Sequence, residues 1–97
     1  MTDLKKGERE LVKNILDQFI PNVEIRVFGS RIKGTAKPWS DLDLAIISSA
    51  PIDLKLMAEI REAFEISSLP FRVDLLDWND ISTSFQRAIE ASGFELL

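Results

Sequence analysis

Apolar side chains recur along the first part of the chain at the spacing of a helix. Between Glu8 and Ile20 they come in adjacent pairs, one pair every four residues, and so line one helix face; they are Leu11, Val12, Ile15, Leu16, Phe19 and Ile20. Pro21 would end this helix, because proline has no backbone N–H to donate and its ring clashes with the preceding turn. We therefore predict an amphipathic helix from Glu8 to Ile20.

The same period predicts two further helices. Asp53 can cap the N-terminus of the first of them, and apolar residues then recur on one side of the segment. Asn79 or Asp80 can cap the last helix, for which Gly93 is a suitable end.

Strand patterns separate these helices. Residues 23–28 alternate between apolar and mostly charged side chains, residues 42–47 are apolar except for one aspartate, and residues 71–76 form a short, largely apolar run. The second run predicts a central strand covered on both faces. Residues 29–40 form a loop with room for one helical turn beginning at Ser30. This alternation predicts an α/β (α+β) fold, in which a small mixed sheet is flanked by helices.

Composition limits the kinds of site that the chain can build. We expect residues 1–97 to form a single domain, because 97 residues leave no room for a second. The chain has no cysteine and no histidine, which excludes disulfides, thiolate or imidazole metal ligands and Ser-His-Asp catalysis. A bound metal would need oxygen ligands, which favours Mg²⁺, Mn²⁺ or Ca²⁺.

Charge and hydropathy narrow the partners and the compartment. The net charge of −4 argues against a long nucleic acid as the main ligand, because domains that bind polynucleotides usually present a basic surface. The N-terminal residues lack the apolar core of a signal peptide. No apolar run approaches the roughly 20 residues of a membrane span. We expect a cytoplasmic protein.

Asp41 and Asp43 stand at the head of the second predicted strand, separated by one residue. Alternate residues of a strand point to the same face, so both carboxylates project together. Carboxylates this close repel each other unless a cation lies between them, which indicates a site for a divalent metal ion. The alternative is that Asp41 belongs to a turn with Ser40 and that Asp43 lies at a solvated strand end.

A third carboxylate, Asp74, lies among the apolar residues of the third predicted strand. If this strand is next to that of Asp43, the carboxylates converge and can hold two Mg²⁺ ions about 4 Å apart. Asp74 could then also accept the proton of an attacking group. Asp77 competes for this role, but alternation puts it on the opposite strand face. The simpler alternative is that Asp74 pairs with an exposed cation such as Arg72.

Gly29 and Ser30 follow directly after the first predicted strand. Glycine lets the backbone approach a phosphate closely, and Ser30 offers a hydroxyl and, at a helix start, N–H groups that favour an anion. Arg31 and Lys33 add cations suited to a triphosphate. Gly34 is not followed by the lysine that a P-loop requires, which excludes that motif. An ordinary turn with solvated charges is the alternative.

Two tryptophans flank the segments that carry these carboxylates. We expect Trp39 and Trp78 to pack at the rim of the core, with stacking on a nucleobase as the alternative.

Three segments together resemble the nucleotidyltransferase superfamily typified by DNA polymerase beta: residues 28–31 (Phe-Gly-Ser-Arg), residues 41–44 (Asp-Leu-Asp-Leu) and residues 73–75 (Val-Asp-Leu). The short chain and the run from Gly-Ser-Arg-Ile-Lys-Gly to Ser-Asp-Leu-Asp-Leu-Ala look most like the minimal nucleotidyltransferases of bacteria and archaea. The resemblance covers nearly the whole chain. It implies the polymerase-beta-like nucleotidyltransferase fold.

The resemblance also implies roles for the site residues. Gly29 and Ser30 would bind the nucleotide phosphates, and Asp41 and Asp43 would be metal ligands. Asp74 would be the third metal ligand and would activate the acceptor hydroxyl.

One departure from the family pattern is visible beside these residues. The family often has Ala and Arg where this chain has Ile32 and Lys33. Lys33 keeps the positive charge but loses the bidentate fork of arginine.

Finally, the resemblance implies a reaction and a partner. Minimal nucleotidyltransferases are often antitoxins paired with a small helical HEPN-type toxin, a ribonuclease, and can transfer AMP from ATP to its tyrosine with Mg²⁺. We expect the acceptor to come from such a partner, because the chain has no evident acceptor-binding domain. One alternative is an antitoxin module that binds nucleotide or partner without catalysis. Another is a small-molecule nucleotidyltransferase like the antibiotic-modifying enzymes, which usually have additional domains.

Overall fold

The computed structural model describes residues 3–97, which fold into a four-stranded sheet with helices on both faces. The elements in chain order are α1 (Lys6–Phe19), β1 (Glu24–Phe28), α2 (Ser30–Lys33), β2 (Leu42–Ile47), α3 (Leu54–Glu65), β3 (Val73–Asp77), the 3₁₀ turn η1 (Trp78–Asp80), α4 (Thr83–Ser92) and β4 (Glu95–Leu96). The strands lie in the order β3-β2-β1-β4.

The sheet is mixed, as the sequence predicts. β1 pairs antiparallel with both β2 and β4, whereas β2 and β3 run parallel. The parallel pair is connected through α3, since parallel strands need a crossover connection instead of a tight turn. The residues after α4, for which the sequence analysis predicts no element, supply β4 at one edge of the sheet.

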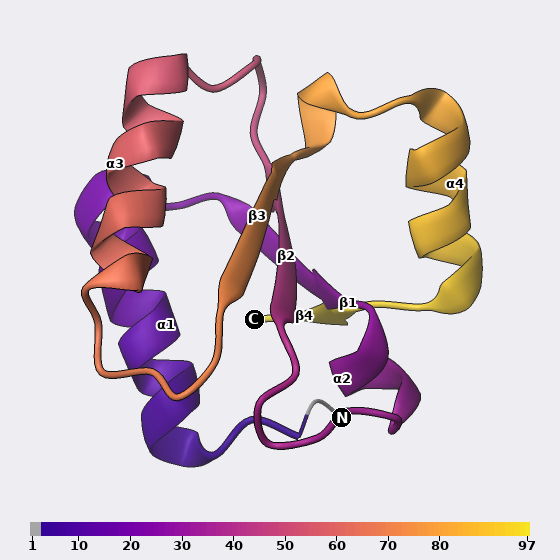
Figure 1. The fold of residues 1–97 in the computed structure, drawn as a ribbon. Helices are drawn as coiled ribbons and strands as arrows, with labels where there is room; N and C mark the ends of the chain where they lie inside the picture. The colour runs from indigo at the N-terminus through magenta and orange to yellow at the C-terminus, as the bar shows by residue number, and fades with distance from the viewer. Residues whose placement is uncertain (1–2) are drawn as a thin grey trace.

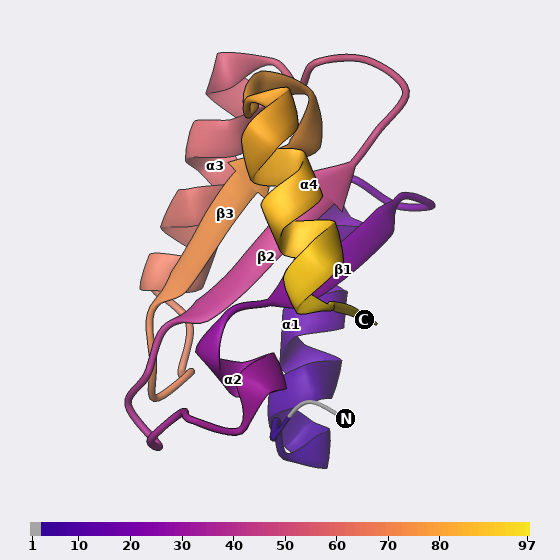
Figure 2. The same cartoon turned by 90° about the vertical axis from the view of Figure 1, so that its right-hand side faces the viewer.

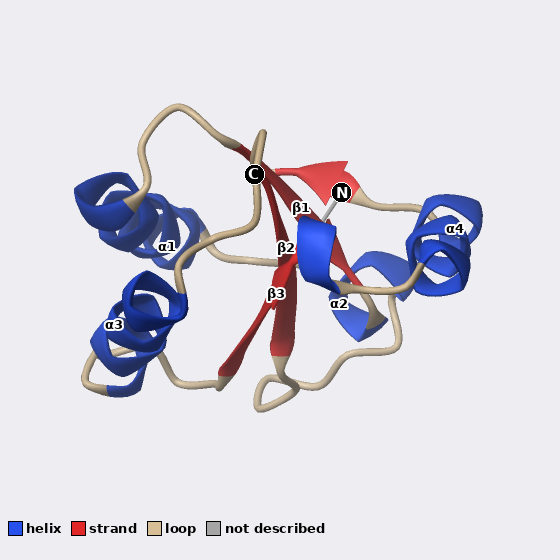
Figure 3. Ribbon diagram, turned by 90° about the horizontal axis from the view of Figure 1, so that it is seen from above, coloured by secondary structure: helices blue, strands red, loops and turns tan. Residues whose placement is uncertain are grey.

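Helices α1 and α3 lie side by side over one face of the sheet (Figure 1). The view from above shows α2 and α4 on the opposite side (Figure 3). Figure 2 shows α4 in front of the sheet, with the short α2 below it. The two faces of the sheet are therefore covered unequally, by a pair of long helices on one side and mainly by α4 on the other.

The core lies between the sheet and the pair α1 and α3. Leu42, Leu44 and Ile46 of β2 point into it and are fully buried. The apolar faces predicted for the helices meet them; the buried residues are Val12, Ile15 and Leu16 of α1 and Met57, Ile60 and Phe64 of α3. Burying one such side chain contributes about 1.5–3 kcal/mol relative to leaving it in water. Burial of these residues fixes which face of β2 meets the core. The residues between them, including Asp43, must therefore point to the opposite face of the sheet.

Most element boundaries agree with the pattern to within two residues. Helix α1 begins two residues earlier than predicted, and its first turn is closed by Glu8, whose carboxylate accepts the N–H of Lys5 at 3.0 Å. Asp53 caps α3 as expected, accepting the N–H of Leu56. Gly93 follows the last residue of α4, also as expected.

The cap predicted for the last helix, Asn79 or Asp80, is wrong. Ser82 caps α4, and its hydroxyl oxygen accepts the N–H of Phe85 at 3.1 Å. Asp77 accepts the N–H of Asn79 at 3.0 Å, which draws residues 78–80 into the turn η1 ahead of the helix. Asn79, Asp80 and Ser82 are all residue types that can cap a helix. Because β3 ends at Asp77 and η1 takes up residues 78–80, Ser82 becomes the cap.

Arg26 of β1 connects the sheet to α4 and the C-terminal segment. Its guanidinium lies over the ring of Trp78 at 4.7 Å and over that of Phe94 at 4.3 Å, and it pairs with Glu24 and Glu90. Trp78 is therefore half-buried at the rim of the fold, as expected.

Trp39 differs from the expectation that it packs at the rim of the core. It is 70% exposed, with the ammonium group of Lys37 at 5.6 Å from its ring. The reason is its position in the loop between α2 and β2, which neither helix layer covers. None of the helices within residues 3–97 has both the length and the apolar character needed to cross a membrane.

Asp77 serves the fold rather than the predicted site. Its side chain is 8% exposed and accepts the N–H groups of Ile52 at 2.8 Å and of Asn79 at 3.0 Å, which joins the start of α3 to the end of β3. The face assignment made from strand alternation is confirmed, because Asp77 pairs in register with Ile46 of the core face.

We predict that Asp77→Ala lowers the free energy of unfolding by about 2–3 kcal/mol, because two partly buried N–H groups lose their acceptor. Urea denaturation followed by circular dichroism measures this change. Asp80→Ala, at an exposed position three residues away, should change stability by less than about 0.5 kcal/mol. Equal effects of the two substitutions would contradict the capping role of Asp77.

Candidate functional site

The register of the parallel pair brings two of the predicted aspartates together. Asp43 of β2 pairs with Asp74 of β3, so the two residues stand side by side on neighbouring strands. Neighbouring strands lie about 4.8 Å apart. Both side chains point away from the core face, because Leu42 and Leu44 on either side of Asp43 are fully buried there. The sequence predicted that these carboxylates would converge if the second and third strands were neighbours, and β2 and β3 are neighbours.

Asp41 completes the group from the residue just before β2. It lies two positions from Asp43 and its side chain is exposed. Asp74 is exposed as well, whereas Asp43, between them, is partly buried. None of the ion pairs described for residues 3–97 involves these three aspartates, so the alternative of a pair between Asp74 and Arg72 is not observed.

Burial and charge act together on Asp43. Desolvation, followed by repulsion from Asp74 and from Asp41, raises the pKa of the Asp43 carboxyl group from 3.8 to about 6. The sheet therefore holds three carboxylates closer together than their charges favour. This is the electrostatic arrangement that a cation would relieve.

The three aspartates offer an open set of oxygen donors. Within residues 3–97, no group of three or more acidic side chains is close enough together to hold a metal ion by itself. Mg²⁺ usually takes only one or two carboxylates and completes its octahedron with waters and substrate phosphates. The donor set therefore fits a hard divalent ion that is shared with a phosphate-bearing substrate.

Gly29 lies directly against this group. Its backbone φ of 81° falls in the left-handed region that favours glycine. A Cβ atom at this position would overlap with Oδ2 of Asp43. The register explains the contact, because Phe28 pairs with Asp43 across the antiparallel ladder. Glycine is thus required here both by the turn and by the carboxylate beside it.

Ser30 begins α2 immediately after this turn. The carbonyl oxygen of Gly29 accepts the N–H groups of Ile32 and Lys33, which closes the single helical turn that the sequence allowed. The first N–H groups of a helix have no acceptor within the helix itself. The N–H groups at the start of α2 are therefore next to the aspartate group and can meet an anionic ligand.

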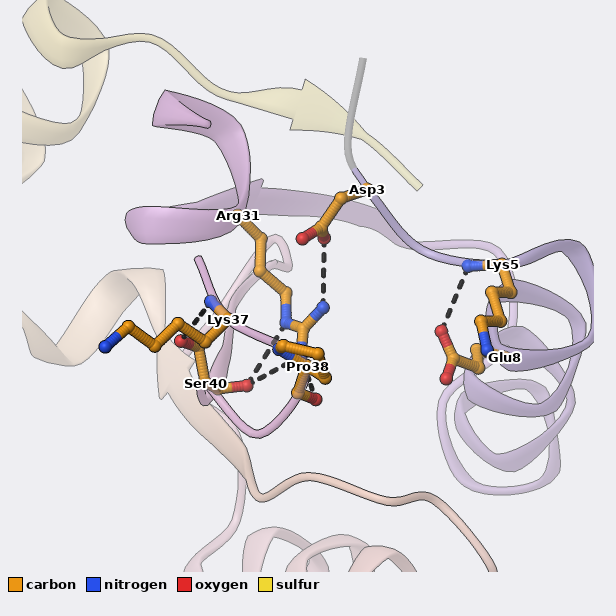
Figure 4. A network of polar contacts seen from close by, with 7 residues as sticks. All are labelled: Asp3, Lys5, Glu8, Arg31, Lys37, Pro38 and Ser40. Carbon is orange, nitrogen blue, oxygen red and sulfur yellow. Dashed lines mark hydrogen bonds and ion pairs between the residues drawn. The ribbon is translucent and has the colours of Figure 1, made fainter. Parts of the chain in front are cut away.

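Arg31 was expected to face a phosphate, but its guanidinium is committed to the loop that leads to Asp41 (Figure 4). The side chain is only 4% exposed. It donates hydrogen bonds to the carbonyl oxygens of Ser40 at 2.8 Å and Pro38 at 3.1 Å, and it pairs with Asp3 at 3.0 Å.

The same guanidinium also lies over the ring of Phe71 at 4.3 Å, just before β3. Arg31 therefore connects α2, the loop before β2 and the segment before β3. The stretch between Gly34 and Asp41 has no helix or strand. Arg31 holds it together with Ser40, whose hydroxyl accepts the N–H of Lys37 at 2.8 Å, and with two backbone hydrogen bonds, Thr35 N–H to Ser30 and Ser40 N–H to Lys37. Sequence reasoning missed this role, because the partners of Arg31 are backbone carbonyl oxygens that carry no residue-type signal.

Lys33 is exposed and borders a cleft of about 280 Å³ beside Gly29. The opposite wall belongs to α4, where Phe85 meets Phe28 edge to face with ring centroids 6.3 Å apart. Phe85 is 42% exposed at this cleft. An aromatic and partly apolar hollow thus adjoins the turn at Gly29.

Known families and proteins resemble this chain. Residues 9–94 match the family described as "Nucleotidyltransferase domain". Over 87 residues the chain is 51% identical to "Probable protein adenylyltransferase MntA" of Haemophilus influenzae, a match that covers 90% of this chain and 76% of that protein.

Two solved structures show the same fold at 26% identity. One, described as the toxin-antitoxin with AMP-PNP, has a TM-score of 0.73, and the match covers 90% of this chain and 69% of that one. The other, a mutant of the toxin-antitoxin MntA-HpeT, has a TM-score of 0.74 with 98% and 72% covered. The fold and the family inferred from the three short motifs are confirmed, and the chain belongs to the nucleotidyltransferase-domain family.

Proposed function

We propose that this chain transfers AMP from ATP to a hydroxyl group of a partner protein and thereby acts as an antitoxin. The observation that carries the proposal is the registered pair of Asp43 and Asp74, set against the turn at Gly29. It is supported by the 51% identity to a protein named as a probable protein adenylyltransferase and by the likeness to a toxin-antitoxin with AMP-PNP.

The metal ions of this reaction would be held by Asp41, Asp43 and Asp74. Two bound Mg²⁺ ions would neutralise the triphosphate and stabilise charge on the attacking and leaving oxygens. The raised pKa of Asp43 supports this assignment, because it shows a carboxylate placed where its charge lacks compensation from the protein.

The remaining residues bind the donor and handle the proton. Gly29 and Ser30 would hold the phosphates through the turn backbone and the serine hydroxyl, and exposed Lys33 would add a positive charge. Asp74 stands on the outermost strand and would accept the proton of the acceptor hydroxyl. Arg31 is reassigned from phosphate binding to positioning, because its donors are already used by Ser40, Pro38 and Asp3.

The cleft between Gly29 and α4 would receive the nucleoside. Its volume of about 280 Å³ and the rings of Phe28 and Phe85 suit a ribose and a flat base. This placement would orient the triphosphate from the α4 side toward the aspartates.

The partner would be a small helical protein of the HEPN type. The proposal follows from the family resemblance and from the two toxin-antitoxin structures of similar fold. Since the donor is ATP, we place the reaction in the cytoplasm, where ATP is abundant.

We predict that Asp43→Asn reduces transfer of label from α-³²P-ATP to the co-expressed helical partner by more than about 100-fold. The estimate follows because even groups that only orient metal ligands contribute 10–100-fold. Gel autoradiography of the purified pair measures the transfer. Asp80→Asn, which removes an exposed carboxylate outside the site, is the matched control and should retain full activity. Unchanged labelling by Asp43→Asn would refute the mechanism and leave a binding module.

We predict that Gly29→Ala reduces transfer by about 100-fold although no catalytic group is removed, because the new Cβ displaces the Asp43 carboxylate. Gly34→Ala is the matched control. Its φ of 75° imposes a similar backbone strain, but no atom of residues 3–97 outside its own chain neighbourhood lies within 4 Å of the added Cβ. Initial rates and melting temperatures of both variants separate displacement from strain. Equal losses of activity in the two variants would show that the contact with Asp43 is unimportant.

We predict that Asp43→Asn stabilises the metal-free protein near neutral pH. The pKa of Asp43 is raised to about 6 in the folded state, so its ionisation opposes folding at higher pH, and this penalty disappears as the pH falls through about 6 toward 3.8. Allowing for solvent screening, the gain should be about 1–2 kcal/mol. Urea denaturation in EDTA across this range measures it. A stability difference between variant and wild type that does not shrink with acidification would contradict the shift.

A further inference from the structure

The cleft of about 280 Å³ beside Gly29 presents few polar side chains to a bound nucleoside. The described residues that line it are Phe28, Gly29, Lys33, Phe85, Ala88, Ile89 and Ser92. Two of these side chains are polar, and Lys33 belongs to α2, which begins directly after the turn at Gly29. In the proposed function Lys33 contributes its charge to the triphosphate. Among the described lining residues, this leaves the hydroxyl of Ser92 as the side-chain group that can meet the edge of a base.

The backbone along the walls of this cleft is largely taken up by secondary structure. Phe28 belongs to the ladder between β1 and β2. The opposite wall belongs to α4, whose N–H and carbonyl groups bond to one another along the helix. The N–H of Phe85, in the first turn of α4, is donated to the hydroxyl oxygen of Ser82 at 3.1 Å. Main-chain groups that are paired in this way are not free to read the donors and acceptors on a base.

The hydroxyl of Ser92 is not suited to tell one base from another. It is on an exposed residue at the end of α4, and a serine hydroxyl rotates and can either donate or accept a hydrogen bond. It can therefore bond to the amino group of adenine as well as to the carbonyl oxygen of guanine. Sites that reject a wrong ligand by roughly 10⁴–10⁵-fold do so with fixed polar groups that this ligand leaves unpaired. The described side chains of the cleft do not form such a set.

The cleft does offer the ring of Phe85. This side chain is 42% exposed, and its contact with Phe28, edge to face with ring centroids 6.3 Å apart, holds the ring in place at the cleft. Every base has a π-face, so stacking on an aromatic ring adds affinity with little dependence on which base is bound. Trp39, the stacking candidate considered from the sequence, is exposed as well but is not among the residues that line the cleft.

We propose that the nucleobase of the donor stacks on Phe85 and is not read along its edge, so that the donor class is nucleoside triphosphates in general, with purines bound more tightly than pyrimidines. The inference rests on the proposed nucleotidyl transfer and names its donor class. ATP is then favoured by its abundance rather than by contacts with adenine.

The bond changes of the transfer are the same for every donor base. The acceptor oxygen forms a bond to the α-phosphorus, and the bond from that phosphorus to the α,β-bridging oxygen breaks. Pyrophosphate leaves with the electron pair, and the hydroxyl proton passes to the carboxylate of Asp74. Selection between donors therefore depends on how the base is bound.

Calorimetric titration of the full chain with four nucleotides tests the inference. ATP, GTP, CTP and UTP are used as analogues whose α,β-bridge is a methylene group, in the presence of Mg²⁺, so that no transfer occurs. The two purine analogues should bind within about threefold of each other, and both should bind about tenfold more tightly than the pyrimidines, because a larger ring system stacks over more of Phe85. A preference of more than about 100-fold for the ATP analogue over the GTP analogue would overturn the inference.

A matched pair of variants tests where the base lies. Phe85→Leu keeps an apolar side chain against Phe28 but removes the ring, and it should weaken the binding of all four analogues by about tenfold. Trp39→Leu removes an exposed aromatic ring outside the cleft and should bind the analogues like the wild type. Circular dichroism and melting temperatures confirm that both variants fold. A loss of affinity in Trp39→Leu with none in Phe85→Leu would overturn the placement of the base.

Ser92→Ala tests whether the hydroxyl reads the base. The variant should leave the ratio of the affinities for the ATP and GTP analogues unchanged, because the hydroxyl can pair with either base. A change in this ratio of more than about tenfold would show that Ser92 selects the base and would contradict recognition by stacking alone.

A transfer assay separates the inference from the function on which it rests. Each of the four nucleotides, labelled with ³²P at the α-phosphate, is offered to the chain together with the co-expressed helical partner, and all four should label the partner. If ATP alone binds and labels the partner, the proposed transfer stands and the inference fails. If all four analogues bind in the expected order but no nucleotide ever labels the partner, the proposed transfer fails while the inference about nucleotide binding stands.

Discussion

The parallel pairing of β2 with β3 is the constraint on which the rest of the structure depends. Its register places Asp43 beside Asp74, and a shift of β2 by one residue would turn Asp43 toward the core. The fully buried Leu42, Leu44 and Ile46 of β2 prevent such a shift, because it would expose them and bury the carboxylate of Asp43. The hydrophobic core thus determines the geometry of a polar site that it does not touch.

The fold holds the three aspartates close together although their negative charges repel one another. Desolvation and the neighbouring aspartates raise the pKa of Asp43, and the contact with Gly29 keeps its carboxylate from moving toward β1. Repulsion between these carboxylates destabilises the fold when no cation is bound, and a cation shared with a triphosphate would remove that repulsion. Stability and ligand binding are therefore in opposition at this position, as is common where a fold is arranged for chemistry.

Strand and helix periods were enough to predict the mixed sheet and nearly all of its elements, since the apolar faces of α1, β2 and α3 are unambiguous. The sequence pattern gave the wrong cap for α4, because several neighbouring residues are of types that can cap a helix. Asp41, Asp43 and Asp74 could be chosen as candidates from the sequence, because they are carboxylates and strand alternation shows that Asp41 and Asp43 share a face. The commitment of Arg31 to loop carbonyls could not be found, because its partners are set by the path of a loop with no period of its own.

The sequence by itself determined which face of each strand is apolar, where the chain turns, and which residues carry the chemistry of a nucleotidyltransferase. Only the tertiary structure decided strand order, and with it that Asp43 and Asp74 are neighbours. The physical reason is that periodicity is a property of one segment and shows only which of its faces is buried. Which elements become neighbours depends on the joint packing of the whole chain.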